Sequence, residues 1–108
     1  MASPTTSISN VTLITAANVY FDGKCVSHSF TTAEGVKKSV GVVLPAILTF
    51  GTGAPEIMEC VGGSADFKLP GSDAWVTSTV GDKFSIPGDI KFEIRVTDNA
   101  YHYICHYC

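Results

Sequence analysis

The chain has 108 residues, of which 45% are hydrophobic and 16% are charged, and its formal net charge is −3 at pH 7. This length supports one hydrophobic core, and the composition is that of a folded domain rather than a disordered segment. Basic residues form no run longer than Lys37–Lys38, so we expect no nucleic acid partner. The longest apolar stretch, residues 40–50, is interrupted by Pro45 and too short to span a bilayer, so no membrane partner is expected.

The N-terminal residues are rich in Ser and Thr and lack the basic and apolar regions of a secretory signal. We therefore expect a cytoplasmic protein whose cysteines stay reduced. Residues 1–18 are interpreted as an N-terminal extension that is partly mobile, and residues 19–108 as the single folded domain.

Beyond the extension, apolar and polar residues alternate with period two, and turn signals rich in Gly, Pro and Asp recur about every eight to twelve residues. No long amphipathic helix is predicted. The predicted strands, in chain order, are residues 11–15, 18–21, 24–31, 37–44, 46–50, 56–62, 65–69, 74–79, 83–86, 91–96 and 101–107. About ten short strands in a chain of this length indicate an all-β sandwich or barrel.

The strand at residues 56–62 has an unusual face, because alternation places Glu56 on the same side as Met58 and Cys60. A carboxylate at the end of an apolar row is one way to line a pocket at the mouth of a barrel. Glu56 is therefore a candidate site residue.

The C-terminal stretch "YHYICHYC" (101–108) contains histidines and a C-x-x-C, which raises the possibility of a metal or redox site. In an extended strand, however, Cys105 and Cys108 point to opposite sides, whereas a zinc site needs both thiolates at one point. Tyr101, Tyr103, Cys105 and Tyr107 then share one face. We interpret the stretch as a closing strand and predict no metal.

Two segments resemble the halves of a cupin motif, "PEIMECVGGSADF" (55–67) and "GDKFSIPGDIKFEI" (81–94), although neither contains a histidine. More specifically, the elements "YFDGKCVSHSF" (20–30), "SVGVVLP" (39–45), "TFGTGAPEIMECVGG" (49–63), "GDKFSIPG" (81–88) and "FEIRV" (92–96) occur in an order and spacing similar to the short cupin family of pyrimidine/purine nucleoside phosphorylases. The resemblance covers residues 20–108. It implies an all-β, single-domain, cupin-like jelly-roll barrel of about ten short strands.

The resemblance also implies an activity, the phosphate-dependent cleavage of purine and pyrimidine nucleosides to a free base and a pentose 1-phosphate. Members of this family work without a metal or organic cofactor, with inorganic phosphate as co-substrate, and form homodimers. This reaction needs a cation for phosphate, a carboxylate for the ribose hydroxyls and an apolar or aromatic slot for the base.

Candidates for these roles follow from the resemblance and the strand faces together. Glu56 is assigned to the ribose hydroxyls and Lys37 to phosphate, as the catalytic pair. The substrate-binding candidates are Ser39 and Thr49 as hydroxyl donors and Met58, Phe92 and Tyr103 around the base. For each, a purely structural role is the alternative: a solvated rim carboxylate, a lysine on a strand edge, or an aromatic residue of the core.

Two other functions remain open at this level. One is a non-enzymatic cupin that binds a small ligand and lacks the metal histidines. The other is a metal or redox module that uses the C-terminal Cys and His residues.

Overall fold

The structure, a computed structural model, describes residues 5–107. It consists of eleven strands and one 3₁₀ turn: β1 (Thr12–Leu13), β2 (Asn18–Tyr20), η1 (Phe21–Gly23), β3 (Cys25–Thr31), β4 (Lys37–Val43), β5 (Ala46–Gly51), β6 (Glu56–Gly62), β7 (Ser64–Lys68), β8 (Val76–Thr79), β9 (Lys83–Ile86), β10 (Lys91–Val96) and β11 (Tyr101–Tyr107). Every predicted strand is present, with ends that agree to within about two residues. The all-β prediction is confirmed.

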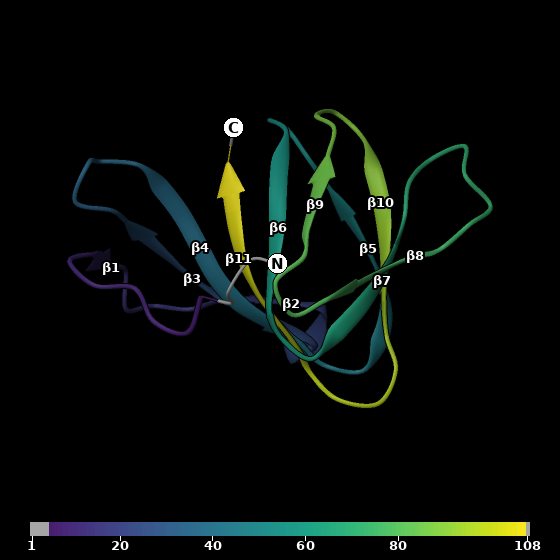
Figure 1. Cartoon of the computed structure of the whole chain (residues 1–108), viewed down its shortest axis with the longest axis horizontal. Coiled ribbons are helices and arrows are strands. Elements are labelled where there is room, and N and C mark those ends of the chain that lie inside the picture. The colour runs from purple at the N-terminus through teal and green to yellow at the C-terminus, as the bar shows by residue number, and fades with distance from the viewer. Residues whose placement is uncertain (1–4, 108) are drawn as a thin grey trace.

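The strands form two antiparallel sheets. The larger, seven-stranded sheet has the order β1-β3-β4-β11-β6-β9, with β2 added to β3. The smaller sheet has the order β5-β10-β7-β8. In Figure 1 the larger sheet occupies the left and centre, and the smaller sheet lies on the right.

The expected closed barrel is not observed, because among the described residues no strand of one sheet pairs with a strand of the other. The chain changes sheet between β6 and β7 at Gly62–Gly63, where Gly63 has φ +67 and any side chain would meet the carbonyl of Ala100. It changes sheet again between β4 and β5, next to Pro45, a residue that has no N–H to offer a ladder. These crossings produce a sandwich that is cupin-like but open.

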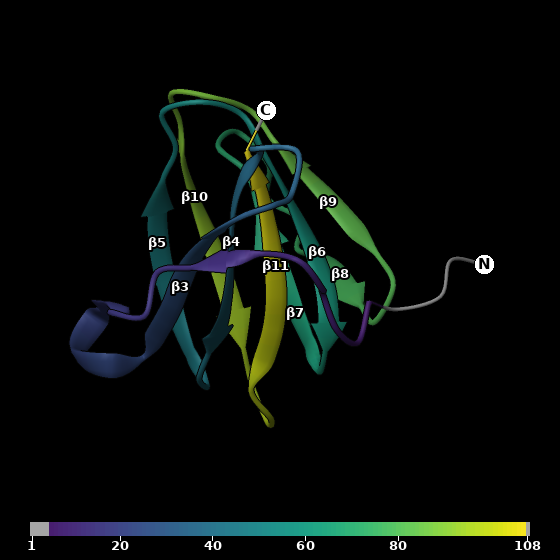
Figure 2. The ribbon, with the colours of Figure 1, turned by 90° about the vertical axis from the view of Figure 1, so that its left-hand side faces the viewer.

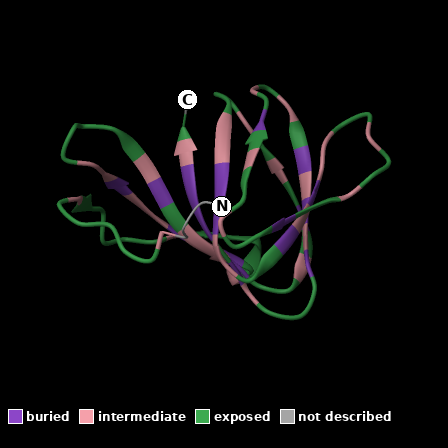
Figure 3. Ribbon diagram, viewed as in Figure 1, coloured by how far each residue is buried: buried purple, intermediate pink, exposed green. Residues whose placement is uncertain are grey.

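Alternation along the strands places the core between the two sheets. Phe92, Ile94 and Val96 of β10 are buried, and Glu93 and Arg95 between them are only partly so. Figure 3 shows the same change from buried to exposed along the strands of both sheets. Aromatic rings contribute much of this core, including Phe67, which is fully buried.

The N-terminal segment lies against the outer face of the larger sheet. Thr12 and Leu13 pair with β3, and Figure 2 shows this part of the chain crossing in front of β3, β4 and β11. Ile8 and Leu13 border the same apolar hollow as Ile104 of β11. The partial mobility predicted for residues 1–18 stays a prediction, and residues 1–4 lie outside the described range. No helix within residues 5–107 has the length and apolar character needed to cross a bilayer.

Candidate active site

A cavity of about 330 Å³ lies between the inner faces of the two sheets. Its walls combine an apolar floor with polar side chains from the ends of β4, β6 and β11. The lining residues are Tyr20, Phe21, Cys25, Ser27, Ser39, Val43, Thr49, Phe50, Gly51, Glu56, Met58, Phe92, Ile94, Tyr103, Cys105 and Tyr107. All the predicted site residues except Lys37 are among them.

Glu56 is the carboxylate of this cavity. It is the first residue of β6 and follows Pro55, and the alternation of the strand sends Met58 to the same side. Burial raises the pKa of the Glu56 carboxyl, although hydrogen bonding with the Cys105 thiol acts in the opposite direction. This carboxylate is therefore partly desolvated, and ligand hydroxyls would stabilise its charged form.

Lys37 lies beside this cavity rather than in it. It borders an adjoining hollow of about 410 Å³ with Asn18, Ser27, Ser29, Tyr20 and Tyr107. Three residues of this hollow, Tyr20, Ser27 and Tyr107, also line the central cavity. The two spaces are therefore neighbours with common walls.

Strand register explains how Lys37 and Glu56 are related. Tyr107 pairs with Glu56 on β6, and His106 pairs with Lys38 on β4, so Lys37 adjoins Tyr107 from the other side. All three residues then face inward in one row across the larger sheet. Because neighbouring strands are about 4.8 Å apart, the Cα atoms of Lys37 and Glu56 are separated by roughly 10 Å.

Tyr107 was missed by the sequence analysis, which placed it correctly on the inner face of the last strand but gave it no role. Its hydroxyl lies 3.0 Å from Oγ of Ser39. Burial raises the pKa of Tyr107 to about 12 and that of the neighbouring Cys105 thiol to about 12. Both groups therefore remain protonated at neutral pH, and Tyr107 keeps a proton to donate.

The deep end of the cavity is formed by Tyr103, whose ring crosses the backbone of β4 at Gly41. The Tyr103 hydroxyl lies 3.7 Å from Sγ of Cys25. Burial also raises the pKa of this phenol. A Cβ placed on Gly41 would stand 2.7 Å from the Tyr103 hydroxyl oxygen, so only glycine leaves room for the ring in this position.

Thr49 contacts the cavity in a different way from the other predicted residues. It is exposed, whereas Leu48 before it is buried, and it pairs with Glu93 of β10. It also borders a separate hollow that contains Lys68 and Glu93. Its hydroxyl is thus less favourably placed for a ligand than that of Ser39.

The outer face of the larger sheet carries a polar cluster of its own. Glu59, only 6% exposed, accepts a hydrogen bond of 2.7 Å from the Thr5 hydroxyl and lies 2.8 Å from Nε2 of His106. Desolvation raises the pKa of Glu59, but these hydrogen bonds and the nearby charges of His106 and Lys83 outweigh it and leave the pKa below its usual range.

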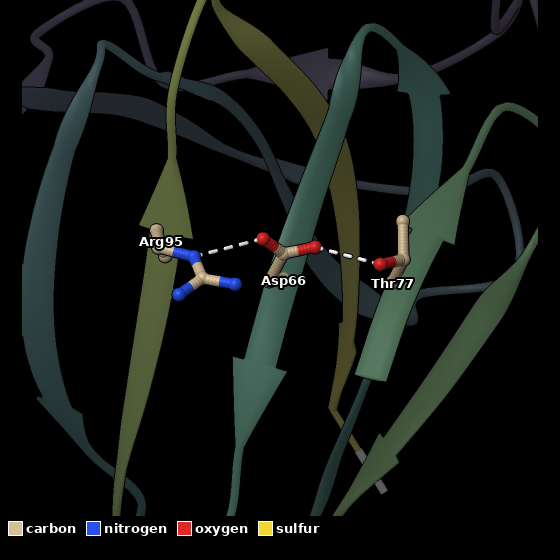
Figure 4. Close-up of polar contacts among 3 residues, drawn as sticks. All are labelled: Asp66, Thr77 and Arg95. Carbon is tan, nitrogen blue, oxygen red and sulfur yellow. Dashed lines mark hydrogen bonds and ion pairs between the residues drawn. The ribbon is translucent and has the colours of Figure 1, made fainter. Parts of the chain in front are cut away.

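The outer face of the smaller sheet has a second polar cluster, shown in Figure 4. Asp66 accepts hydrogen bonds from the Thr77 hydroxyl at 2.7 Å and from Nε of Arg95 at 2.9 Å. The Arg95 guanidinium also lies over the ring of Trp75, 4.3 Å from its centre. Neither outer cluster borders the central cavity.

The C-terminal Cys and His residues form no ligand set within the described chain. His106 is paired with Glu59, His102 is exposed, and Cys108 lies outside the described residues. Among residues 5–107 no group of three or more His, Cys, Asp or Glu side chains is placed to hold a metal ion.

Together these features define a small cupin-like sandwich with one polar-rimmed cavity between its sheets. The family profile of pyrimidine/purine nucleoside phosphorylases matches residues 15–107. Proteins of that name from Paracidovorax citrulli and Ralstonia pickettii are each 68% identical over 103 residues, covering 95% of this chain and 97% of the relative. The chain belongs to the pyrimidine/purine nucleoside phosphorylase family.

Solved structures show the same fold. A crystal structure of a protein of unknown function from Acinetobacter sp. ADP1 superimposes with a TM-score of 0.90 at 38% identity, covering 94% of this chain and 98% of that one. A second, from Vibrio parahaemolyticus, has a TM-score of 0.81 at 41% identity, covering 86% and 97%.

Proposed function

We propose that this protein is an enzyme that cleaves purine and pyrimidine nucleosides with inorganic phosphate, releasing the free base and a pentose 1-phosphate. The observation that carries the proposal is the inward-facing row of Lys37, Tyr107 and Glu56, which spans two adjoining hollows. One hollow provides a carboxylate and an apolar wall, and the other provides a cation and hydroxyl groups. A nucleoside and a phosphate ion need these two environments side by side.

In this reaction a phosphate oxygen forms a bond to C1′ of the sugar while the bond from C1′ to the base nitrogen breaks. The electron pair of the broken bond goes to the base, and the proton carried by hydrogen phosphate passes to that nitrogen. Positive charge develops on the sugar in between, as in other glycosyl transfers. Negative groups fixed near C1′ lower the barrier.

Glu56 holds the sugar. Its partly desolvated carboxylate accepts hydrogen bonds from the ribose hydroxyls in place of water. Because hydrogen bonding to a carboxylate favours its charged form, sugar binding also lowers the raised pKa of Glu56. Met58 and Tyr103 form the floor beneath the sugar and the base.

Phosphate binds on the Lys37 side. The ammonium group neutralises the anion, and the hydroxyls of Ser39 and Tyr107 donate hydrogen bonds to it. Since Tyr107 borders both hollows, its hydroxyl lies at the point where phosphate meets C1′. We expect no metal or organic cofactor in this scheme.

Two further properties are part of the proposal. The protein forms a homodimer, which would cover some of its exposed apolar side chains, such as Ile14 and Val19. It acts in the cytoplasm, where the unpaired cysteines Cys25, Cys60 and Cys105 would stay reduced. Light scattering after size exclusion tests the first property, and fractionation of source cells tests the second.

The activity is tested by measuring base release from uridine and adenosine with and without phosphate. Lys37→Met should raise the KM for phosphate at least about tenfold, the value of a charge-assisted contact. Lys38→Met is the matched control, because Lys38 pairs with His106 and faces the opposite side of the sheet. Absence of phosphate-dependent base release across a nucleoside panel would disprove the proposed function, and equal effects of the two lysine variants would disprove the phosphate site.

A further inference from the structure

The turn η1 contains an unusual backbone conformation. Among the described residues four that are not glycine have positive φ, and three of them are Asn10, Asp22 and Asp89. Asn and Asp tolerate this region because their short side chains form local hydrogen bonds. The fourth is Phe21, with φ 53, and for an aromatic residue this conformation is a genuine outlier.

Packing of the Phe21 ring supports this conformation and brings it to the cavity. Its ring lies edge-on to Phe50 of β5, with ring centres 5.1 Å apart, and Phe50 in turn stacks on Phe92 at 5.8 Å. Phe21 belongs to the connection between β2 and β3 of the larger sheet, whereas Phe50 and Phe92 belong to the smaller sheet. The contact between Phe21 and Phe50 thus connects the two sheets, whose strands do not pair with each other.

The ring nevertheless remains available to a ligand. Phe21 is 42% exposed while it lines the cavity, so part of its surface is covered by Phe50 and part is free. The aromatic residues deeper in the cavity differ, since Tyr103 is 6% exposed and Phe92 is 3% exposed. Neither of these has a free face on which a planar group can stack.

We propose that Phe21, held by its left-handed backbone against Phe50, forms the wall on which the nucleobase stacks. This inference rests on the proposed function and adds a wall for the base beside Met58, Phe92 and Tyr103, the residues predicted from the sequence for that role. Every base has a π-face, so a stacking wall accepts purines and pyrimidines alike, and purines bind it more tightly because their face is larger.

The test measures binding of adenosine and of uridine without phosphate, by titration calorimetry. Phe21→Ala should weaken adenosine binding about tenfold or more and uridine binding less, which is the range of base–aromatic stacking. Inorganic phosphate should bind as in the wild-type protein. Ile47→Ala is the control, because Ile47 is also apolar and exposed but does not line the cavity.

Two further variants separate stacking from folding. Phe21→Gly also removes the ring but suits a positive φ, so it should unfold at a higher temperature than Phe21→Ala and lose affinity for adenosine to the same extent. Phe21→Trp keeps an aromatic face and should retain affinity. Adenosine affinity within twofold of wild type in both Phe21→Ala and Phe21→Gly would overturn the inference, as would an equal loss of phosphate and adenosine binding.

Free adenine distinguishes this inference from the proposed function. If no nucleoside is cleaved but wild-type protein binds adenine and Phe21→Ala does not, the function is wrong and the stacking wall is correct. If base is released normally and Phe21→Ala binds adenine like the wild type, the function is correct and the stacking wall is wrong.

Discussion

Substitution of Gly41 by alanine tests how the floor of the cavity is built. A Cβ at this position would lie 2.7 Å from the Tyr103 hydroxyl, 2.8 Å from its Cζ atom and 2.7 Å from the backbone carbonyl oxygen of Val26. The Tyr103 side chain can move, but the carbonyl belongs to the neighbouring strand of the sheet. Overpacking of this kind costs about 1–3 kcal/mol.

That loss is a large share of the roughly 5–15 kcal/mol by which domains are stable. For a domain of this size each kcal/mol corresponds to a Tm shift of about 4–8 °C. Urea unfolding followed by the fluorescence of Trp75 should therefore show a lower midpoint for Gly41→Ala with an unchanged slope. Base release should fall as well, because displacement of Tyr103 alters the cavity floor.

Gly53→Ala is the matched control, since a Cβ at Gly53 meets no heavy atom within 4 Å and its φ is not in the left-handed region. It should unfold within about 0.5 kcal/mol of the wild type. If Gly41→Ala is as stable as Gly53→Ala, the close packing of Tyr103 on β4 is wrong. If Gly41→Ala is unstable and a second change of Tyr103 to leucine recovers nothing, the carbonyl contact alone accounts for the loss.

Three further predictions concern charged and hydroxyl groups. Glu56→Gln should lower kcat/KM about 100-fold or more yet raise the Tm at pH 7. The pKa of Glu56 is raised in the folded protein, so the stability that this group contributes is lost as pH rises through that pKa. Equal Tm values for the variant and the wild type would contradict this sign. Tyr107→Phe should lower the free energy of unfolding by about 0.5–1.5 kcal/mol, because the hydrogen bond to Ser39 is lost. It should also raise the KM for phosphate, and an unchanged KM in steady-state kinetics would show that Tyr107 does not bind phosphate. Glu59→Gln should make the Tm fall less steeply in acid. The pKa of Glu59 is lowered in the folded protein, so this group stabilises the fold above its unfolded-state pKa and the contribution disappears as pH falls through its folded-state pKa. Thermal unfolding between pH 3 and 7 measures this effect, and identical pH profiles of the Tm for variant and wild type would refute the role.

The strands were predictable because a half-buried strand leaves a period-two pattern in the sequence. The residues 56–62 and 101–107 illustrate this, since both their limits and their inward faces agree with the structure. Alternation defines which face is buried, but it carries no information about which strands are neighbours. For that reason the strands could be predicted from the sequence, but the open sandwich could not be distinguished from a closed barrel.

The candidate site was predictable to a similar extent. Glu56 and Lys37 were selected from the sequence, yet their position in one row with Tyr107 depends on strand order, which only the fold provides. Phe21 could not be found from local preference, because a phenylalanine is not expected at positive φ. The Asp-Gly pair at residues 22 and 23 is typical of a turn, but it carries no information about the direction of the ring before it.

The place of β11 in the larger sheet also determines how the chain can fold. β11 lies between β4 and β6, although both of these strands precede it in the sequence. A nascent chain that has reached β6 therefore exposes two unpaired edges, separated by a gap that only a later segment can fill. Such edges recruit strands from other molecules, and pairing of distant segments is slow. We expect newly made chains to depend on holding chaperones until β11 emerges. The row of Lys37, Tyr107 and Glu56 forms only when β11 has entered the sheet.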